Sequence, residues 1–434
     1  MKIPKRVASV VINSLKGGVV PRTGLSYITV GRKDEMDAIL HDVDIVAGGG
    51  AAFRFIEGRY GSGKSFLLQA VRNYVMDRGF VVIDADLSPE RRLHGNRGQG
   101  LATYRELIGQ MSTRTRPEGG ALKLILDRWL ASLEAEADGA AAPGSPEHRR
   151  TMDRLVSESV LSMDGMVHGY DFGRVLTVYY RAHADGDPDA GAKVLRWLRG
   201  EYQNRTEAAR EIGVNAVITD DDWYDYVKLF AAFLKQAGYA GLMMLVDELV
   251  NIYKIPNRIA RESNYEKILA MYNDVLQGRA VHLGIIMSGT PECIENPQRG
   301  VYSYEALRSR LADGRFSREG MRDMLAPIIR LEPLTPEEMT VLVERLADIH
   351  AVLFDCERAV TEQDMIGFIR TEYSRIGADS RITPREVIRD FIELLDIMHQ
   401  HPGTTAAELM GSDSFIYAKG GPDGDEEGIP EFEL

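Results

Sequence analysis

The octapeptide Gly58-Arg59-Tyr60-Gly61-Ser62-Gly63-Lys64-Ser65 is the most informative stretch of this sequence, because it satisfies the pattern G-x-x-x-x-G-K-[ST]. Residues 53–56 before it form an apolar run typical of a buried strand, and apolar residues recur after it at helical spacing until Arg78-Gly79. In such a setting the glycines allow successive N–H groups to point at phosphate oxygens, and the helix N-terminus adds a positive dipole end. The sequence therefore predicts a phosphate-binding loop, or P-loop.

Two residues of the octapeptide have expected roles in phosphoryl transfer. Lys64 is expected to reach the β- and γ-phosphates, and Ser65 is expected to offer its hydroxyl to Mg²⁺. The alternative is a glycine-rich turn without a ligand, and the correct flanking elements argue against it. The other positions expected to bind nucleotide at this loop are Gly58, Tyr60, Gly61, Ser62, Gly63 and Phe66.

Length and composition indicate a large cytoplasmic protein. The 434 residues, 44% of them hydrophobic, can bury a large core and suggest two or three domains. No apolar run approaches the roughly 20 residues that cross a bilayer, and the basic start lacks a signal-peptide core. The two cysteines, Cys293 and Cys356, follow no metal-ligand or disulfide pattern, which fits a reducing cytoplasm.

The charge balance bears on nucleic-acid binding. A formal net charge of −13 argues against a protein that coats nucleic acid through bulk electrostatics, although local basic stretches could still contact phosphates. The basic loop at residues 91–97 is one such stretch, and we favour a solvated face over a nucleic-acid contact there. Part of the negative charge lies in the last residues, which mix acids with Gly and Pro and suggest a disordered tail.

A second nucleotide signal lies at residues 242–248, where an apolar strand ends in two acids. This is the pattern of a Walker B strand. Asp247 is expected to hold the Mg²⁺ shell, and Glu248 is expected to orient and polarise the attacking water. Any buried strand can end in Asp-Glu, so the signal gains its weight from the P-loop that precedes it.

Further strands are predicted at residues 80–84, 282–287 and 328–331, with helices between them. This alternation predicts a parallel sheet that is covered by helices on both faces. The strand at 282–287 continues into Ser288-Gly289-Thr290, whose hydroxyls would lie beside the Walker B strand if the two strands are neighbours. Ser288 or Thr290 is then a candidate sensor of the γ-phosphate, and a simple Ser-Gly turn is the alternative.

The P-loop helix and the Walker B strand are separated by far more residues than one crossover needs, so the sequence predicts an inserted subdomain. Loop signatures interrupt the insertion at residues 138–146 and 185–188. A helix that starts after Thr219-Asp220-Asp221-Asp222 ends it. Its aromatic stripe is predicted to belong to the core rather than to a binding surface; the members are Trp223, Tyr226, Phe230 and Phe233.

After residue 332 the pattern is helical, and two capping boxes begin helices at Thr335-Pro336-Glu337-Glu338 and Thr383-Pro384-Arg385-Glu386. The second box is unusual. Arg385 places a cation in the first helical turn, where the macrodipole disfavours it by a few tenths of a kcal/mol to about 1 kcal/mol. A nearby nucleotide phosphate would supply the missing anion, and such broken local rules often mark function.

These elements together resemble a known family. The order of Val30-Gly31-Arg32, P-loop, Walker B acids, hydroxyl-bearing strand, arginine-rich helix and Pro-Arg helix start is similar to that of the AAA+ ATPases, nearest their origin-recognition and STAND-like branches. More narrowly, the chain resembles the BREX-type ATP-binding proteins (BrxD-like) over about residues 5–400. The more specific cues are residues 17–21, 57–65, 288–292, 304–311 and 383–391.

The resemblance implies a three-layer P-loop AAA+ core with a large, mainly helical insertion and a C-terminal helical lid. It divides the chain into a first half of the core with the P-loop, the insertion, a second half of the core with Walker B, sensor and arginine finger, the lid and an acidic tail; the boundaries are 1–87, 88–240, 241–332, 333–402 and 403–434. It implies ATP and Mg²⁺ as ligands and a cytoplasmic prokaryotic ATPase encoded with anti-phage defence genes.

The resemblance also implies roles for four arginines. Arg310 is our choice for the finger that completes a neighbouring subunit's site, and Arg308 is the second choice; both point away from the side that carries Leu307 and Leu311. A solvent-exposed arginine is the alternative for each. Arg385 matches the lid sensor, and Arg32 is expected near the base or ribose. The sequence departs from the family in replacing the usual sensor Asn by Ser288 or Thr290.

Two classes of function stay open. The first is an ATP-driven motor or loader that assembles as a ring of identical subunits and remodels DNA or a DNA-bound partner such as a helicase. The second is a nucleotide-gated switch or scaffold that hydrolyses ATP slowly and signals to effector proteins. Glu248 and a candidate finger favour the first. A small-molecule kinase has little support, because no acceptor-site residues follow the P-loop.

Overall fold

The computed structural model describes residues 3–312, 314, 322–376 and 383–411. Its chain divides into two compact units. The helical unit comprises Met1–Lys33, Tyr60–Phe66 and Glu332–Leu434, and the sheet unit comprises Asp34–Arg59 and Leu67–Leu331. The P-loop residues 60–66 thus group with the N- and C-terminal helices, although the strand before them belongs to the sheet unit.

The sheet unit contains five parallel strands in the order β2-β3-β4-β1-β5. Each strand predicted from the sequence is present, within a few residues at its ends. Because parallel neighbours need crossover connections, helices separate the strands along the chain. The bounds are β1 (Ala51–Glu57), β2 (Val81–Asp86), β3 (Leu242–Asp247), β4 (Leu283–Gly289) and β5 (Ile328–Arg330).

Helices cover both faces of this sheet, as the alternating pattern predicts. Side chains along β3 alternate between two cores: Leu242 and Met244 lie in one, and Met243 and Leu245 lie in the other. The smaller core contains α2 (Lys33–Ala47) and α3 (Lys64–Asp77), and the larger core contains α4 (Gln99–Gly109), α10 (Trp223–Gln236) and α12 (Arg258–Leu276). The strands are therefore apolar on both faces, as expected for buried parallel strands.

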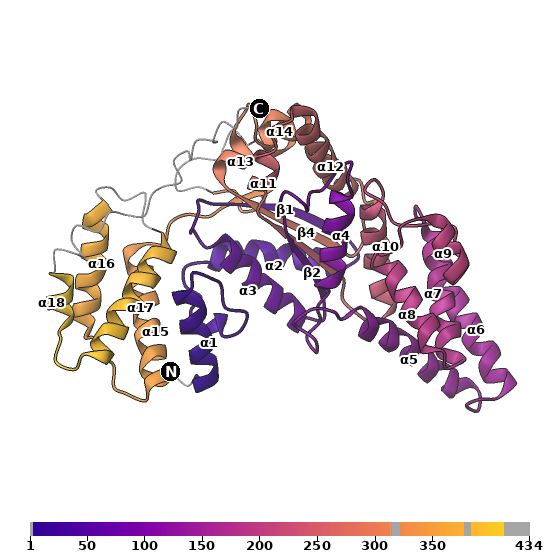
Figure 1. The fold of residues 1–434 in the computed structure, drawn as a ribbon, viewed down its shortest axis with the longest axis horizontal. Coiled ribbons are helices and arrows are strands. Elements are labelled where there is room, and N and C mark those ends of the chain that lie inside the picture. Colours follow the sequence, from indigo (N-terminus) through magenta and orange to yellow (C-terminus); the bar gives the residue numbers. More distant parts are fainter. Residues whose placement is uncertain (1–2, 313, 315–321, 377–382, 412–434) are drawn as a thin grey trace, which may run out of the picture. The chain divides into compact units, whose positions relative to one another are not determined.

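A long run of helices separates β2 from β3, as predicted. Figure 1 shows α5 to α9 as a helical group that continues from α10. Two predicted loop signatures directly precede helix starts, where Ser145 and Asp187 accept hydrogen bonds as N-caps before a proline. The bounds in this group are α5 (Leu122–Ala140), α6 (Pro146–Leu161), α7 (Gly169–Ala184), α8 (Pro188–Leu198) and α9 (Arg205–Ile212).

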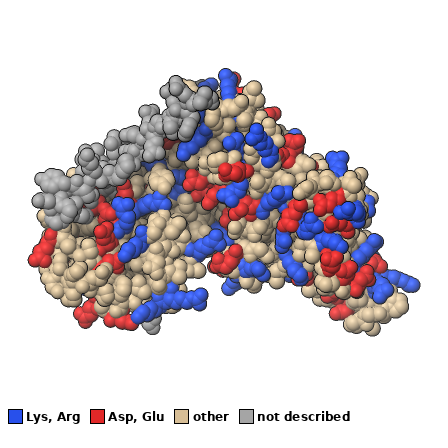
Figure 2. Space-filling view, in the orientation of Figure 1, with Lys and Arg blue, Asp and Glu red and all other residues tan. Residues whose placement is uncertain are grey.

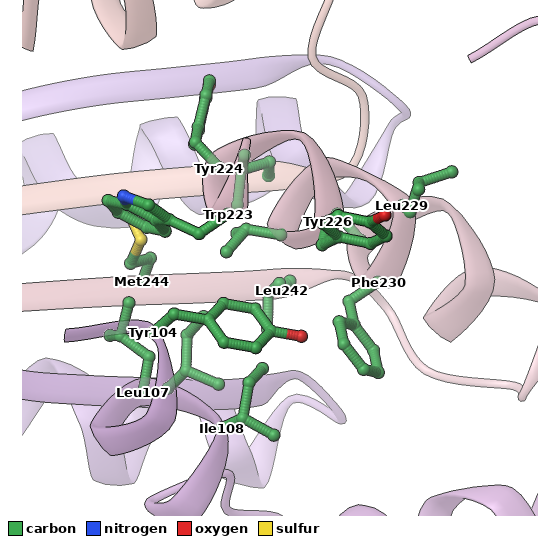
Figure 3. Close-up of a cluster of buried hydrophobic side chains, with 14 of the residues drawn as sticks. Tyr104, Leu107, Ile108, Trp223, Tyr224, Tyr226, Leu229, Phe230, Leu242 and Met244 are labelled. Carbon is green, nitrogen blue, oxygen red and sulfur yellow. The ribbon is translucent and has the colours of Figure 1, made fainter. Parts of the chain in front are cut away.

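The aromatic stripe of α10 is part of the core, as predicted. Trp223, Tyr226, Phe230 and Phe233 are each at most 1% exposed. Figure 3 shows the first three of them packed with Tyr104, Leu107 and Ile108 of α4 and with Leu242 and Met244 of β3. The buried residues of α5 to α9 belong to the same continuous core, so the insertion packs on the sheet through α10.

Three shorter helices and two turns of 3₁₀ helix complete the described elements around the sheet and the N-terminal segment. They are α11 (Val250–Tyr253), α13 (Pro291–Glu295), α14 (Glu305–Leu311), and the 3₁₀ turns Leu25–Tyr27 and Val301–Ser303. On α14, Leu307 and Leu311 are buried while Arg308 and Arg310 are exposed, as the helical spacing predicts.

The helical unit contains α1 (Lys5–Lys16), α15 (Pro336–Phe354), α16 (Glu362–Ile376), α17 (Pro384–Gln400) and α18 (Ala406–Met410). Both predicted capping boxes are formed. The Thr335 and Thr383 hydroxyls accept from the N3 backbone N–H groups, and the side chains of the N3 glutamates accept from the N-cap backbone N–H groups. The sequence analysis missed α1, whose Ala8, Val11 and Ile12 pack with α15 and α17 in one core. The tail predicted to be disordered, 403–434, is described as far as residue 411, and this part contains α18, which begins at a capping box of Thr405 and Glu408; residues 412–434 lie outside the described residues.

Candidate nucleotide site

The P-loop connects the end of β1 to the start of α3. Gly61 and Gly63 have φ angles of 76° and 96°, which residues other than glycine rarely adopt. The α3 helix begins at Lys64, so Lys64 and Ser65 lie in its first turn beside N–H groups that have no partner within the helix. No acidic residue lies in that turn, and the positive end of a helix dipole favours an anion.

Two local features distinguish the predicted phosphate-binding loop. The Ser62 hydroxyl is buried, and among the described residues it has no hydrogen-bond partner, so a phosphate oxygen would satisfy it. At Gly61, an added Cβ would lie 2.9 Å from the Thr383 Oγ1 atom, so only glycine fits against the capping box of α17. The loop therefore carries a buried hydroxyl of the kind that binds a phosphate oxygen, and a glycine that lets the loop pack against α17.

Arg32 holds the P-loop from the N-terminal segment. Its side chain is 6% exposed. Its Nη2 atom donates to the Ser62 carbonyl oxygen at 3.0 Å, and its Nη1 atom donates to the Glu332 carbonyl oxygen at 2.9 Å. The resemblance placed Arg32 near the base or ribose, whereas these contacts are to the backbone of the loop and of the segment before α15.

Arg385 also contacts the P-loop. Its guanidinium carbon lies 5.0 Å from the centroid of the Tyr60 ring, and its Nη2 atom donates to the Gly18 carbonyl oxygen. The ring face and the carbonyl oxygen both carry partial negative charge, so they compensate the cation in the first turn of α17. The sequence predicts a nucleotide phosphate for that task and does not reveal these two partners.

The strand predicted to be Walker B and the hydroxyl-bearing strand are neighbours, as the sequence-based hypothesis required. Val246 pairs with Met287 in the β3–β4 register, which places Asp247 beside Ser288. The Ser288 hydroxyl donates to the Asp247 Oδ1 atom, and both residues are buried. Ser288 therefore orients the carboxylate that was predicted to hold Mg²⁺. Thr290 lies at the N-cap of α13, where its side chain makes no capping bond.

Glu248 has an unusual backbone conformation. Its φ angle is 64°, in the left-handed region that costs a non-glycine residue about 1–3 kcal/mol. Its N–H group donates to the Asp247 Oδ1 atom at 2.8 Å, and the following Leu249 N–H group donates to the Ser288 carbonyl oxygen at 3.1 Å. These hydrogen bonds thus fix the backbone at Glu248, whose side chain is exposed.

Asp86 is an acidic residue of this region that sequence reasoning missed. It ends β2 opposite Asp247 in the β2–β3 register. Burial raises the pKa of Asp86, and the charges of Asp247 and Glu248 raise it further. The strand predicted from the sequence ends at residue 84, two residues before Asp86, and only the strand order shows that the end of β2 lies beside Asp247.

An ion pair between a buried glutamate and a half-buried arginine lies at the end of β1, just before the P-loop. Glu57 is 4% exposed and pairs in register with Arg330 of β5. The Arg330 Nε atom lies 3.6 Å from Glu57 Oε2, and its Nη2 atom donates to Glu295 Oε1 at 2.7 Å. Sequence reasoning did not find this pair, because the two residues lie far apart along the chain.

Phe66 is partly buried and packs against the core of the helical unit, whereas the two candidate arginine fingers lie in the sheet unit. Arg308 and Arg310 are exposed on α14, and the Arg310 Nη1 atom donates to the Ala306 carbonyl oxygen at 2.7 Å. The basic loop at residues 91–97 is anchored rather than free: the N–H groups of Leu93 and His94 donate to the Asn264 Oδ1 atom at 2.9 and 3.0 Å.

Among the helices that the structure describes, none is long and apolar enough to span a membrane. No curated protein matches the chain. The family model described as BREX system ATP-binding protein BrxC/D matches residues 3–414. The chain with this P-loop and these strand-end acids therefore belongs to the BrxC/D family of BREX system ATP-binding proteins.

Proposed function

We propose that this protein is an AAA+ ATPase that hydrolyses ATP as an oligomer and uses the energy to remodel or load DNA, or a DNA-bound partner such as a helicase, in anti-phage defence. One observation carries the proposal. Helix α3 begins at Lys64, and the loop before it contains two glycines with positive φ angles and a buried Ser62 hydroxyl that has no hydrogen-bond partner among the described residues. This arrangement suits a polyphosphate, and the family binds ATP.

The proposed roles follow the chemistry of phosphoryl transfer. Lys64 neutralises charge on the β- and γ-phosphates, while loop N–H groups and the Ser62 hydroxyl hold phosphate oxygens. Ser65 and Asp247 are the residues that would hold Mg²⁺, which supplies charge neutralisation when bound. Glu248 polarises the attacking water.

The environment of Glu248 supports turnover rather than binding alone. A strained, left-handed backbone persists only where neighbouring contacts over-determine it, and such strain clusters at active sites. The bond from Ser288 to Asp247 leaves Glu248 as the exposed carboxylate of the Walker B pair. We propose that Arg310, or else Arg308, then stabilises the transition-state charge in a neighbouring subunit.

DNA contact, in this proposal, depends on assembly. Figure 2 shows acidic and basic side chains interspersed over α5 to α9 rather than a surface of one sign. With a net charge of −13, a single chain has little electrostatic attraction for duplex DNA. DNA binding should therefore require ATP and oligomers and should weaken steeply as salt rises.

A nucleotide-gated switch with slow hydrolysis is the second candidate. The contacts of the P-loop within the helical unit favour it, because Arg32 bonds Ser62 and Arg385 covers Tyr60. A loop held in this way can pass a change in bound phosphate to the helices that hold it.

The ATP hydrolysis rate, measured with and without DNA beside electron-microscope images of the particles, separates the two candidates. A motor predicts turnover that DNA stimulates in ordered oligomers. A switch predicts slow turnover that DNA does not change, with a particle state that depends on ATP or ADP. Absence of ATP binding would contradict both.

A further inference from the structure

We propose that Arg32 is a positioning residue that sets the shape of the P-loop, so that it governs polyphosphate affinity without contacting the base or ribose. This inference rests on the proposed binding of ATP at the P-loop. The observation behind it is the bond from the Arg32 guanidinium to the Ser62 carbonyl oxygen at 3.0 Å, made by a side chain that is 6% exposed.

The geometry of the peptide bond explains how this contact acts on the phosphate side of the loop. No described peptide bond is cis. In a planar trans peptide the carbonyl oxygen and the next N–H group point in opposite directions. When Arg32 holds the Ser62 carbonyl oxygen, it therefore turns the Gly63 N–H group away from Arg32, where it can serve as an anion donor.

Arg32 itself is held firmly. Gly31 has a φ angle of 65°, and a Cβ added there would lie 2.6 Å from Glu338 Cδ and 2.7 Å from Leu334 Cδ2. Glu338 belongs to the capping box that starts α15. The second Arg32 bond, to the Glu332 carbonyl oxygen at 2.9 Å, leads into the same segment. The Arg32 guanidinium is thus held through its Nη1 atom, while its Nη2 atom bonds to the loop.

The fork of the guanidinium matters as much as its charge. Two different carbonyl oxygens, of Ser62 and Glu332, accept from its two terminal nitrogens. A lysine ammonium is a point charge on a flexible stem and does not reproduce that planar fork. Arg32→Lys should therefore keep part of the effect, and Arg32→Met, which has no donor, should lose it.

The test measures the affinity of the full-length protein for Mg·ATP and for inorganic tripolyphosphate by calorimetry. For Arg32→Met, hydrogen bonds from a charged donor are lost, and we expect both affinities to fall by the same factor of about 10 to 100. Arg32→Lys should fall between this variant and wild type. Arg345→Met is the matched control, because Arg345 also donates to a backbone carbonyl in the helical unit, that of Thr29 at 2.6 Å.

Three results would overturn the inference. The first is a loss of ATP affinity with unchanged tripolyphosphate affinity, which would place Arg32 at the base or ribose. The second is unchanged affinity for both ligands in Arg32→Met. The third is an equal loss in Arg345→Met, which would mean general destabilisation. If Arg32→Met does not fold, Arg32→Lys decides by the same comparison. Failure of the wild-type protein to bind ATP would instead contradict the proposed function.

Discussion

The Ser288 hydroxyl on β4 donates a hydrogen bond to the Asp247 carboxylate on β3. The two strands are adjacent and parallel, so their carboxyl ends bring a hydroxyl and an acid together from segments about 40 residues apart. Asp247 Oδ1 also accepts from the Glu248 N–H group. One carboxylate oxygen of Asp247 is thus held from two directions, which orients the carboxylate.

Removing the Ser288 hydroxyl should therefore impair catalysis. In Ser288→Ala the carboxylate loses the Ser288 donor, and we expect the ATP hydrolysis rate to fall about tenfold with ATP affinity nearly unchanged. Steady-state hydrolysis and calorimetric binding measure the two effects. Ser303→Ala is the matched control, since the Ser303 hydroxyl donates to a neutral carbonyl oxygen, that of Gly300. A Ser288→Ala rate equal to that of wild type would separate Ser288 from the reaction.

The assignment of Arg310 can be tested by mixing variants. If Arg310 acts on a neighbouring subunit, Arg310→Ala should bind ATP yet lose hydrolysis by a factor of about 10³–10⁵, because a finger stabilises the transition state. Lys64→Ala should be inactive because its own P-loop fails. Mixed oligomers contain interfaces with an intact loop and an intact finger, so activity should partly return.

The same mixing experiment can also contradict the proposed action of Arg310 on a neighbouring subunit. Mixed oligomers that form but stay inactive would show that Arg310 does not act across a subunit interface. Repeating the mixture with Arg308→Ala tests the second candidate, because both arginines are exposed on α14.

The stability of the helical unit should depend on pH through His350. Its ring is buried and contacts Asp396, and burial lowers the pKa of His350 despite the opposing effect of that carboxylate. A lowered folded-state pKa means that the unfolded chain binds the proton more readily. This contribution to stability is therefore intact above about pH 6.5 and is lost as pH falls through the lower folded-state pKa.

Thermal unfolding at pH 7.5 and 5.5 measures that response. Wild type should lose stability relative to His350→Gln as pH falls, because the variant has no imidazole to protonate. His41→Gln, at an exposed position on α2, should behave like wild type. A difference between wild type and His350→Gln that stays constant with pH would contradict the linkage.

The local parts of the fold could be predicted from the sequence. The five strands, the P-loop and the two capping boxes each depend on residues within about ten positions of one another, and each is present. The aromatic stripe of α10 was correctly predicted as core because its spacing defines one helix face. The proximity of Ser288 to the Walker B strand was conditional on strand order, which the structure provides.

The relationships that the sequence could not show join distant segments. The packing of α1 on α15 and α17 depends on apolar faces that many other helices share. The bond from Arg32 to Ser62 and the pairing of Glu57 with Arg330 depend on the final register of chain and sheet. Asp86 was not predicted as a site residue, because only its pairing with the neighbouring strand places it beside Asp247. The roles of the predicted arginines stay predictions.

ATP hydrolysis by the wild-type protein and by Glu248→Gln, measured beside ATP affinity, tests the central claim most directly. The account predicts measurable turnover in wild type and a rate at least about a hundredfold lower in Glu248→Gln, with ATP affinity retained, because only the base is lost. Glu262→Gln, which removes a carboxylate on α12 that pairs with Arg258, should keep the wild-type rate. A near-normal rate in Glu248→Gln, or a wild-type protein that turns over no ATP with or without DNA, would contradict the account.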